Sequence, residues 1–559
     1  MHIKLKSYLA VLICVLMVFL TACSDDAGTK KINLYTQDAT HQKAISLPQE
    51  PRFNKLLDND GKINKDYLVP ATSTVIKKNY DNRVYIEYNE KTFFYNPVYI
   101  SYEQILNNKN ISLENKSAVL EEAFSKAKSC GFKTVALYVD WKSFYNGEKY
   151  NYDFYKIYYK LAEKYDLYVS IIWLGYSKNG FMPWQVDREK YPELQADKEQ
   201  IKVSIPDLSQ QIYIDEACNA LDQFCAWLNY IDFNKRTVLI QLEDEAGTNY
   251  GFGAWLSQFS NYSNLLLKMA ETIKKSAYNV VTTVGVTFDD YKLELEGLTG
   301  RERLDLFLNS EYIDGMGAAN LTTPDFNVGT FANDEKFCYI SKLSPATYDF
   351  FQYSLSCLSQ GYSFGVYELK SFDLNINCGI YRTHSTRWDV RNKELVDRGI
   401  LVKKRLYESN TNDIIDFIKS INSLGGVLAY TSIYDIISLN PGVYNNYIFS
   451  HKINKLAIDV NKVSDIALSF NNSVNSGFTY NSAGIAVIDP YSNLYVFAFH
   501  GSPALAVDCN YDVSFEKGTF IDDQWVASSE PIPVPDHRFI MQSGIVYKII
   551  LEDNKIVLK

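Results

Sequence analysis

Short apolar segments rich in β-branched and aromatic residues alternate with helical patterns over most of this 559-residue chain. The segments that we interpret as strands are 96–100, 132–139, 167–173, 237–242, 279–286, 304–316, 363–367 and 426–430. Amphipathic helical patterns separate them, for example over 113–130 and 212–230. Strands that each lead into a helix, repeated about eight times, are typical of a parallel (β/α)8 TIM barrel. We therefore predict an α/β fold with this barrel over residues 96–451.

The pattern differs on both sides of the predicted barrel. Before it, residues 83–95 form two apolar strands around a polar turn, which predicts an N-terminal hairpin region over 51–95 that packs on the barrel. After about residue 452, short apolar strands recur without helices between them. That pattern predicts a C-terminal β-sandwich domain over 452–559.

The N-terminus carries the features of an export signal. His2, Lys4 and Lys6 precede an apolar run over 9–20 that is short for a membrane span. The run ends in Leu-Thr-Ala-Cys, which resembles the lipobox of bacterial lipoproteins, and an ordinary signal peptide is the alternative. We predict a signal peptide over 1–22, lipidation at Cys23 and a polar tether over 23–50.

The lipid would anchor the protein to a membrane. The acidic residues after Cys23 indicate on which membrane, and on which of its faces, the protein lies. Ser24-Asp25-Asp26 resembles the surface-export signal of lipoproteins in one phylum of gut bacteria. We therefore expect a surface-exposed outer-membrane lipoprotein, with a periplasm-facing position as the alternative.

Composition narrows the classes of partner. The net charge of −10 argues against nucleic acid as a partner. The 43 tyrosines offer rings that suit sugar faces, although core packing accounts for most aromatic residues. The cysteines form no CxxC pair and no Cys/His zinc spacing, so we predict no metal and no cofactor.

Two carboxylates far apart in the chain, Glu245 and Glu368, are the candidate catalytic groups. The segment from 237 ends in Glu243-Asp244-Glu245, and Glu368 follows the segment that we interpret as the seventh strand. Carboxyl ends of barrel strands meet at one mouth, where active sites lie. A retaining glycosidase needs two carboxyl groups about 5–5.5 Å apart at such a mouth. The alternative for the acidic triplet is a solvated turn.

Several motifs resemble β-galactosidases of glycoside hydrolase family 35. Residues 241–247, QLEDEAG, resemble the family's strand-four motif Q-V-E-N-E-x-G. The segment 171–180 with Pro183 and Trp184 is similar to a strand-three loop of a bacterial branch, 89–93 to its hairpin, and 139–141 to its strand-two end. The resemblance covers roughly residues 83–435 and leaves out the C-terminal domain.

The resemblance implies a role for each matched acid. Glu245 would be the general acid/base and Glu368 the nucleophile, since strands four and seven carry this pair in the family's clan. Glu243 would support the site. The family has Asn where this chain has Asp244, and an ionised Asp accepts hydrogen bonds where Asn can donate. This departure puts the family's activity in question for this chain.

Further residues are expected to line the mouth and bind substrate. They are Asp140, Trp141, Trp173, Tyr176, Trp184, Tyr381 and Arg382, together with Asp244. Core packing is the alternative for the tryptophans and for Tyr176. Residues 370–408, which contain Tyr381 and Arg382, are expected to form a substrate wall, with a structural excursion as the alternative.

Three functions remain open at this point. The first is a retaining glycoside hydrolase that cleaves β-linked glycans, with galactosides first, so that its partner is an oligosaccharide or polysaccharide. The second is a non-catalytic glycan-binding lipoprotein on a degenerate glycosidase barrel, which Asp244 favours. The third is a purely structural surface protein.

Overall fold

The computed structural model describes the following parts of the chain: residues 56–100, 113–145, 148–175, 193–198, 201–246, 258–287, 296–319, 335–343, 354, 357–358, 361–367, 408–431, 436–439, 456–457, 463–464, 467–471, 484–489, 491, 493–498, 504–508, 512–521, 524–542 and 544–552.

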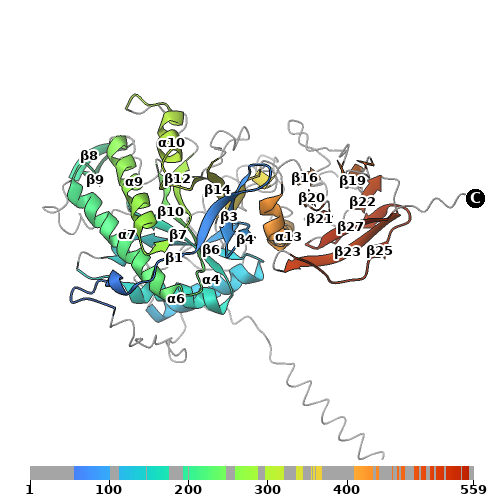
Figure 1. Ribbon diagram of the computed structural model, residues 1–559, viewed down its shortest axis with the longest axis horizontal. Helices are drawn as coiled ribbons and strands as arrows, with labels where there is room; N and C mark the ends of the chain where they lie inside the picture. The colour runs from blue at the N-terminus through green and yellow to red at the C-terminus, as the bar shows by residue number, and fades with distance from the viewer. Residues whose placement is uncertain are drawn as a thin grey trace, which may run out of the picture. The chain divides into compact units, whose positions relative to one another are not determined.

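Eight parallel strands close into a barrel in the order β10-β12-β13-β14-β15-β5-β6-β7. Figure 1 labels β6, β7, β10, β12 and β14 among them. In chain order they are β5 (Pro97–Ile100), β6 (Thr134–Asp140), β7 (Tyr168–Leu174), β10 (Thr237–Ala246), β12 (Thr282–Thr287), β13 (Gly315–Ala319), β14 (Phe337–Leu343) and β15 (Ser363–Val366). Neighbours pair in register, as Val135 of β6 does with Val169 of β7. The predicted (β/α)8 barrel is therefore confirmed.

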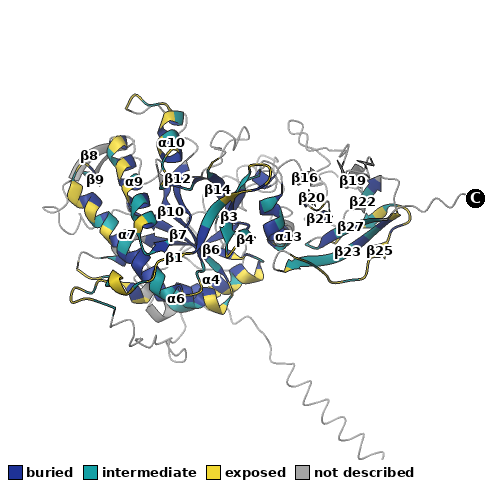
Figure 2. Ribbon diagram, viewed as in Figure 1, coloured by how far each residue is buried: buried dark blue, intermediate teal, exposed yellow. Residues whose placement is uncertain are grey.

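Helices surround the strands, with their buried faces toward the strands and their exposed faces outward (Figure 2). They are α4 (Leu113–Ser129), α5 (Trp141–Phe144), α6 (Tyr152–Lys164), α7 (Gln211–Ile231), α9 (Phe259–Lys275), α10 (Gly300–Leu308) and α13 (Glu408–Tyr430). The start of α10 is fixed by a capping box between Thr299 and Glu302. No helix in the described part of the chain is long and apolar enough to cross a bilayer.

The order of the last two barrel strands differs from the prediction, although the segment 363–367 was correctly predicted as a strand. The seventh strand is β14, a segment that the sequence interpretation missed, and the eighth is β15. Residues 426–430, predicted as the eighth strand, belong to α13, which is kinked at Gly425 (φ 41°, ψ −111°). An apolar run of this length fits a buried helix as well as a strand, which explains the error. Most of the sixth predicted segment, 304–316, lies in α10 and the turn before β13.

A hairpin closes the N-terminal end of the barrel. Strands β2 (Thr74–Lys78), β3 (Val84–Tyr88) and β4 (Lys91–Phe93) form an antiparallel sheet. Asn89 and Glu90 join β3 to β4, and both have positive φ (49° and 63°), as a two-residue type I′ turn requires. Ile86 and Phe93 pack with Val238, at the start of β10, in one buried cluster. The hairpin therefore covers the end of the barrel opposite to the mouth.

Shorter elements complete the barrel region. They are the 3-10 helix η1 (Lys65–Tyr67), the parallel pair β1 (Ala71–Thr72) and β11 (Tyr278–Asn279), and the antiparallel pair β8 (Glu193–Lys198) and β9 (Ile201–Pro206).

The C-terminal part consists of antiparallel sheets around a separate core. The larger sheet contains β16 (Ile436–Leu439), β20 (Gly484–Ile488), β21 (Leu494–Ala498), β23 (Asp512–Ile521), β24 (Gln524–Ala527), β25 (Ile532–Pro533) and β27 (Val546–Glu552). The smaller sheet contains β19 (Ala467–Asn471), β22 (Ala504–Asp508) and β26 (Arg538–Ile540), and β17 (Leu456–Ala457) pairs with β18 (Val463–Ser464). Val496 and Phe515 of the larger sheet share a core with Leu505 of the smaller one. This agrees with the predicted β-sandwich, whose first strand, β16, lies before residue 452.

Candidate functional site

The C-terminal end of β10 departs from regular strand geometry. Leu242 pairs with Val284 of β12, but the next pair is Ala246 with Val286. Between these pairs β10 advances by four residues while β12 advances by two. Glu243 lies in this bulge with φ +61°, a left-handed conformation that is rare for a residue other than glycine. Bulges of this kind re-aim side chains and are frequent beside functional sites. The bulge therefore sets the direction of the Glu243 and Asp244 side chains at the barrel mouth.

Asp244 points into the barrel and forms an ion pair with Lys342 of β14. Its Oδ2 lies 2.5 Å from Lys342 Nζ and accepts a hydrogen bond from the Tyr138 hydroxyl at 3.2 Å. The side chains of Asp244 and Lys342 are only 6% and 7% exposed. Strands β10, β14 and β6 are not adjacent in the barrel. The ion pair therefore crosses the interior at the mouth from β10 to β14, and the Tyr138 hydrogen bond connects it to β6.

A second bulge brings Lys342 to this position. Ile340 pairs with Phe364 of β15 and Leu343 with Val366, so β14 holds one residue more than its partner between these pairs. The extra residue changes the alternation of side chains and turns Lys342 into the barrel. Both members of the ion pair thus lie at or next to a strand irregularity.

Three tyrosine rings surround the Lys342 ammonium group. Its Nζ lies 4.7 Å from the ring centre of Tyr367, 5.8 Å from that of Tyr99 and 5.9 Å from that of Tyr138. A cation at these distances is attracted by the electron-rich ring face. The rings and Asp244 together compensate a charge that would otherwise be costly to bury.

A neutral hydrogen-bonded layer lies beneath the ion pair. The Tyr339 hydroxyl donates to Gln241 Oε1 and lies 3.2 Å from Thr283 Oγ1. The Tyr95 hydroxyl lies 2.8 Å from Ser170 Oγ. Burial raises the pKa of both Tyr95 and Tyr339 because the phenolate form would lose its hydration. These tyrosines are therefore neutral hydrogen-bonding groups at physiological pH.

The structure changes the interpretation of the predicted catalytic pair. Glu245 lies on β10, the fourth barrel strand, as predicted, and its side chain lies outside the described residues. Glu368 lies outside them too, but β15 ends at Val366, so Glu368 follows the eighth strand and not the seventh. The seventh strand, β14, contains no carboxylate, and Lys342 is the charged residue near its C-terminal end. The assignment of Glu368 to strand seven was wrong because β14 was missed.

Two predicted substrate-binding tryptophans are core residues. Trp141 and Trp173 are both fully buried. Trp141 packs edge-on against Tyr213 at a centroid distance of 5.1 Å, and Trp173 packs against Phe224 at 5.2 Å. Neither ring offers a face to a sugar in this structure. The structure thus favours the core-packing alternative for both.

The other predicted site residues are only partly described or not described. Asp140 is the last residue of β6, at the mouth, but its side chain lies outside the described residues. Tyr176, Trp184, Tyr381, Arg382 and Cys23 also lie outside them. Their expected roles remain predictions.

The sequence interpretation missed the cation and the rings around it. Lys342 is the only charged residue in the otherwise apolar and hydroxyl-rich strand FCYISKL, which was the available signal. Tyr99, Tyr138 and Tyr367 lie on or next to predicted strands, but nothing in their spacing indicates that they meet around one ammonium group.

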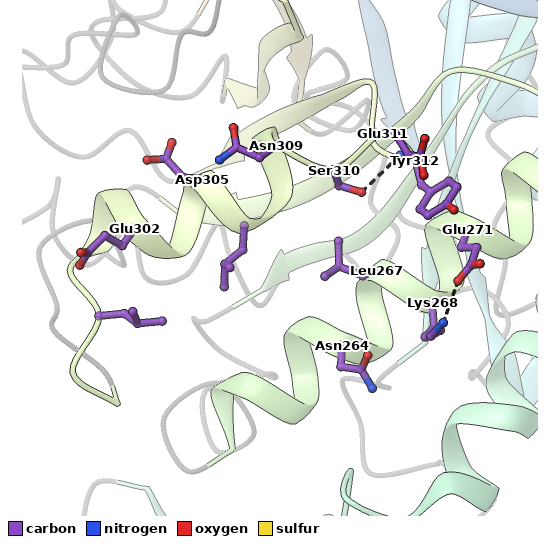
Figure 3. Close-up of a pocket in the computed structure, with 12 residues that line it drawn as sticks. Asn264, Leu267, Lys268, Glu271, Glu302, Asp305, Asn309, Ser310, Glu311 and Tyr312 are labelled. Atoms are coloured by element: carbon purple, nitrogen blue, oxygen red, sulfur yellow. Dashed lines mark hydrogen bonds and ion pairs between the residues drawn. The ribbon is translucent and has the colours of Figure 1, made fainter.

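A hollow also lies on the outer flank of the barrel, between α9 and α10 (Figure 3). Its volume is about 770 Å³, and its lining includes Leu267, Glu271 and Asp305. The carboxylates there already have partners: Glu271 pairs with Lys268, and Asp305 with Arg301. Among the described residues, no group of three or more His, Cys, Asp or Glu side chains is placed to hold a metal. The mouth is therefore the better candidate for a functional site.

Comparisons with known proteins give structural similarity only. No protein-family model matches the chain, and no curated protein matches it by sequence. A family 39 glycoside hydrolase from the gut symbiont Bacteroides cellulosilyticus matches with a TM-score of 0.39 and 11% identity, over 86% of this chain and 87% of that one. A maltogenic α-amylase from Thermotoga neapolitana matches with a TM-score of 0.38 and 9% identity, over 82% and 98%. A β-1,4-D-mannanase from Cryptopygus antarcticus matches with a TM-score of 0.35 and 12% identity, over 54% and 90%.

Proposed function

We propose that this protein binds a glycan at the barrel mouth and does not hydrolyse it by the two-carboxylate mechanism. The observation that carries this proposal is the ion pair between Asp244 of strand four and Lys342 of strand seven. These are the two strands from which the family 35 resemblance expects the acid/base and the nucleophile. At the second of these strands the chain has a cation.

The chemistry of glycoside cleavage explains why this cation matters. A retaining enzyme needs a carboxylate about 5–5.5 Å from its acid/base to attack the anomeric carbon. An ammonium group beside Asp244 cannot supply that nucleophile, and it would repel the positive charge that develops on the sugar in the transition state. The pair instead provides one donor group and one acceptor group at the mouth. Both kinds of group are useful for recognising sugar hydroxyls.

The experiment compares binding with turnover. Purified protein is tested against a panel of β-linked oligosaccharides, galactosides first, by isothermal titration calorimetry, and against the matching aryl glycosides for release of the aryl group. We expect saturable binding of at least one glycan and no release above the uncatalysed rate. Lys342→Met should weaken the binding at least tenfold. Turnover by the wild-type protein would contradict the proposal.

A second candidate function is hydrolysis of β-linked glycans with Glu245 as acid/base and Glu368 as nucleophile. It is favoured by the position of Glu245 at the mouth end of β10 and by the end of β15 two residues before Glu368. Strands β10 and β15 are four steps apart in either direction around the barrel, so they lie opposite each other. A wide carboxyl separation would favour inversion, whereas the resemblance implies retention.

The stereochemistry of the product separates these possibilities. If the wild-type protein cleaves an aryl β-galactoside, proton NMR of the first sugar released shows whether the anomeric configuration is retained. Glu245→Ala and Glu368→Ala should then each lose most of the activity. If both variants remain active, this assignment of the catalytic pair is excluded.

We also propose that a lipid on Cys23 holds the protein on the outer surface of a bacterial outer membrane, which would place the barrel near extracellular glycans. Metabolic labelling with a palmitate analogue should mark the wild-type protein and not Cys23→Ala. Proteinase added to intact cells should degrade a surface-exposed protein, whereas a periplasm-facing one would be protected.

A further inference from the structure

We propose that Gln241 is a positioning residue that holds the bulge of β10 in the shape that the glycan site needs. This inference rests on the proposed glycan site at the mouth. Gln241 is fully buried, two residues before the strained Glu243, and its side chain bonds to Tyr339 and to the backbone of Glu243. Its contribution therefore has to act through the backbone of its neighbours.

The amide of Gln241 contacts the backbone of the bulge directly. Its Nε2 donates to the carbonyl oxygen of Glu243 at 2.7 Å and lies 3.4 Å from that of Asp244. These carbonyls lie outside the regular ladder of hydrogen bonds with β12, because the pairing shifts between Leu242 and Ala246. A buried carbonyl without a partner costs about 1–3 kcal/mol, so the amide replaces hydrogen bonds that the bulge removes.

The amide is itself held in one orientation. Its Oε1 accepts a hydrogen bond from the Tyr339 hydroxyl, which also contacts Thr283 Oγ1 at 3.2 Å. With the oxygen occupied by a donor, the nitrogen is left to face the two carbonyls. Tyr339 and Lys342 lie on the same strand, β14, so one strand supports both the bulge and the partner of Asp244.

Gly285 of β12 provides the space that this arrangement requires. A Cβ atom at Gly285 would lie 2.6 Å from the carbonyl oxygen of Asp244 and 2.5 Å from Gln241 Nε2, and it would also clash with the carbonyl oxygen of Glu243. No side chain can be added there unless the bulge moves. The strained backbone of Glu243 is thus held on one side by the Gln241 amide and accommodated on the other by Gly285, which has no side chain. A preorganised site requires such support for a strained residue.

The test substitutes the amide and keeps the length of the side chain. Gln241→Met removes the hydrogen bonds to Glu243, Asp244 and Tyr339, and Tyr159→Phe is the matched control. The Tyr159 hydroxyl is buried 2.8 Å from Thr237 Oγ1, at the opposite end of the same strand. Glycan affinity is measured by calorimetry with the best ligand of the panel, and hydrogen exchange by mass spectrometry on peptides that cover 240–247. Urea unfolding shows that both variants are folded.

We expect Gln241→Met to weaken glycan binding at least tenfold and to speed exchange in 240–247 at least fivefold. Tyr159→Phe should leave the affinity within twofold of wild type and exchange in this peptide unchanged. Gly285→Ala should resemble Gln241→Met. The proposal is overturned if Gln241→Met binds and exchanges like wild type, or if both variants lose affinity in proportion to their loss of stability. If the wild-type protein binds no glycan, the proposed function fails, and the exchange data alone decide whether Gln241 holds the bulge.

Discussion

The barrel interior contains two polar regions that differ in charge. The lower region is neutral: hydroxyl groups of Tyr95 and Tyr339 pair with Ser170 and with the amide of Gln241. The mouth region is ionic, with Asp244 and Lys342 paired at 2.5 Å. Neutral hydrogen bonds fix geometry without placing charge in a low dielectric, whereas a buried ion pair costs desolvation that its attraction does not always offset. We infer that the lower region stabilises the barrel, whereas stability alone does not explain the ion pair at the mouth.

The largest effect should come from breaking the ion pair on one side. Lys342→Met leaves the Asp244 carboxylate buried without its cation, which should lower the free energy of unfolding by about 3–5 kcal/mol. The double variant Lys342→Met with Asp244→Leu should lie within about 1 kcal/mol of wild type, because no charge is then left unpaired. Urea unfolding monitored by tryptophan fluorescence measures both. If the double variant is as unstable as the single one, the cost does not come from an uncompensated charge.

A smaller effect is expected in the neutral region. Tyr339→Phe keeps the ring but leaves Gln241 Oε1 buried without its donor, which should cost about 1–3 kcal/mol of unfolding free energy. Thr283→Val should cost less, since the bond between Tyr339 and Gln241 remains. The same urea measurement applies. If Tyr339→Phe lowers the free energy of unfolding as much as Lys342→Met does, the neutral and ionic regions do not differ in the expected way.

The two regions also differ in how far the sequence predicts them. The barrel follows from the alternation of strands and helices, and the acidic end of the segment from 237, together with that alternation, predicts carboxylates at the mouth. The bulges were not predictable, because a pairing shift depends on the partner strand, and no local pattern marks the positive φ of Glu243. Lys342 was missed for a related reason. Its strand, FCYISKL, was not recognised, and its contact with Asp244 joins residues 98 positions apart.

Alkaline pH should affect the neutral region first. The pKa values of Tyr95 and Tyr339 are raised above the ordinary 10.0 because burial disfavours the phenolate. A group whose pKa is higher in the folded state contributes stability below its unfolded pKa and loses it as the pH rises further. We therefore expect a constant unfolding free energy up to about pH 10 and a loss of up to about 1.4 kcal/mol per pH unit for each such tyrosine above it. Tyr339→Phe should reduce this slope, and an unchanged slope would show that other groups cause it.

The smallest effect should come from an ionic cluster outside the barrel, which tests whether burial or charge matters more at the mouth. On α9, Glu271 bonds to Lys268 and Lys275, and these hydrogen bonds lower the pKa of its carboxyl to about 2. The two lysine side chains are 53% and 65% exposed, so water and salt screen the interaction. Glu271→Gln should lower the unfolding midpoint at pH 7 only slightly. Because a lowered carboxyl pKa contributes stability above the unfolded value of 4.5 and loses it as the pH falls toward 2, this small difference from wild type should shrink toward pH 2, which gives the variant a flatter acid limb. High salt should remove this difference but not the effect of Lys342→Met, because the side chains of Asp244 and Lys342 are largely buried, with exposures of only 6% and 7%. If salt removes both effects equally, the ion pair at the mouth behaves as a surface pair, and burial does not distinguish it from the cluster on α9.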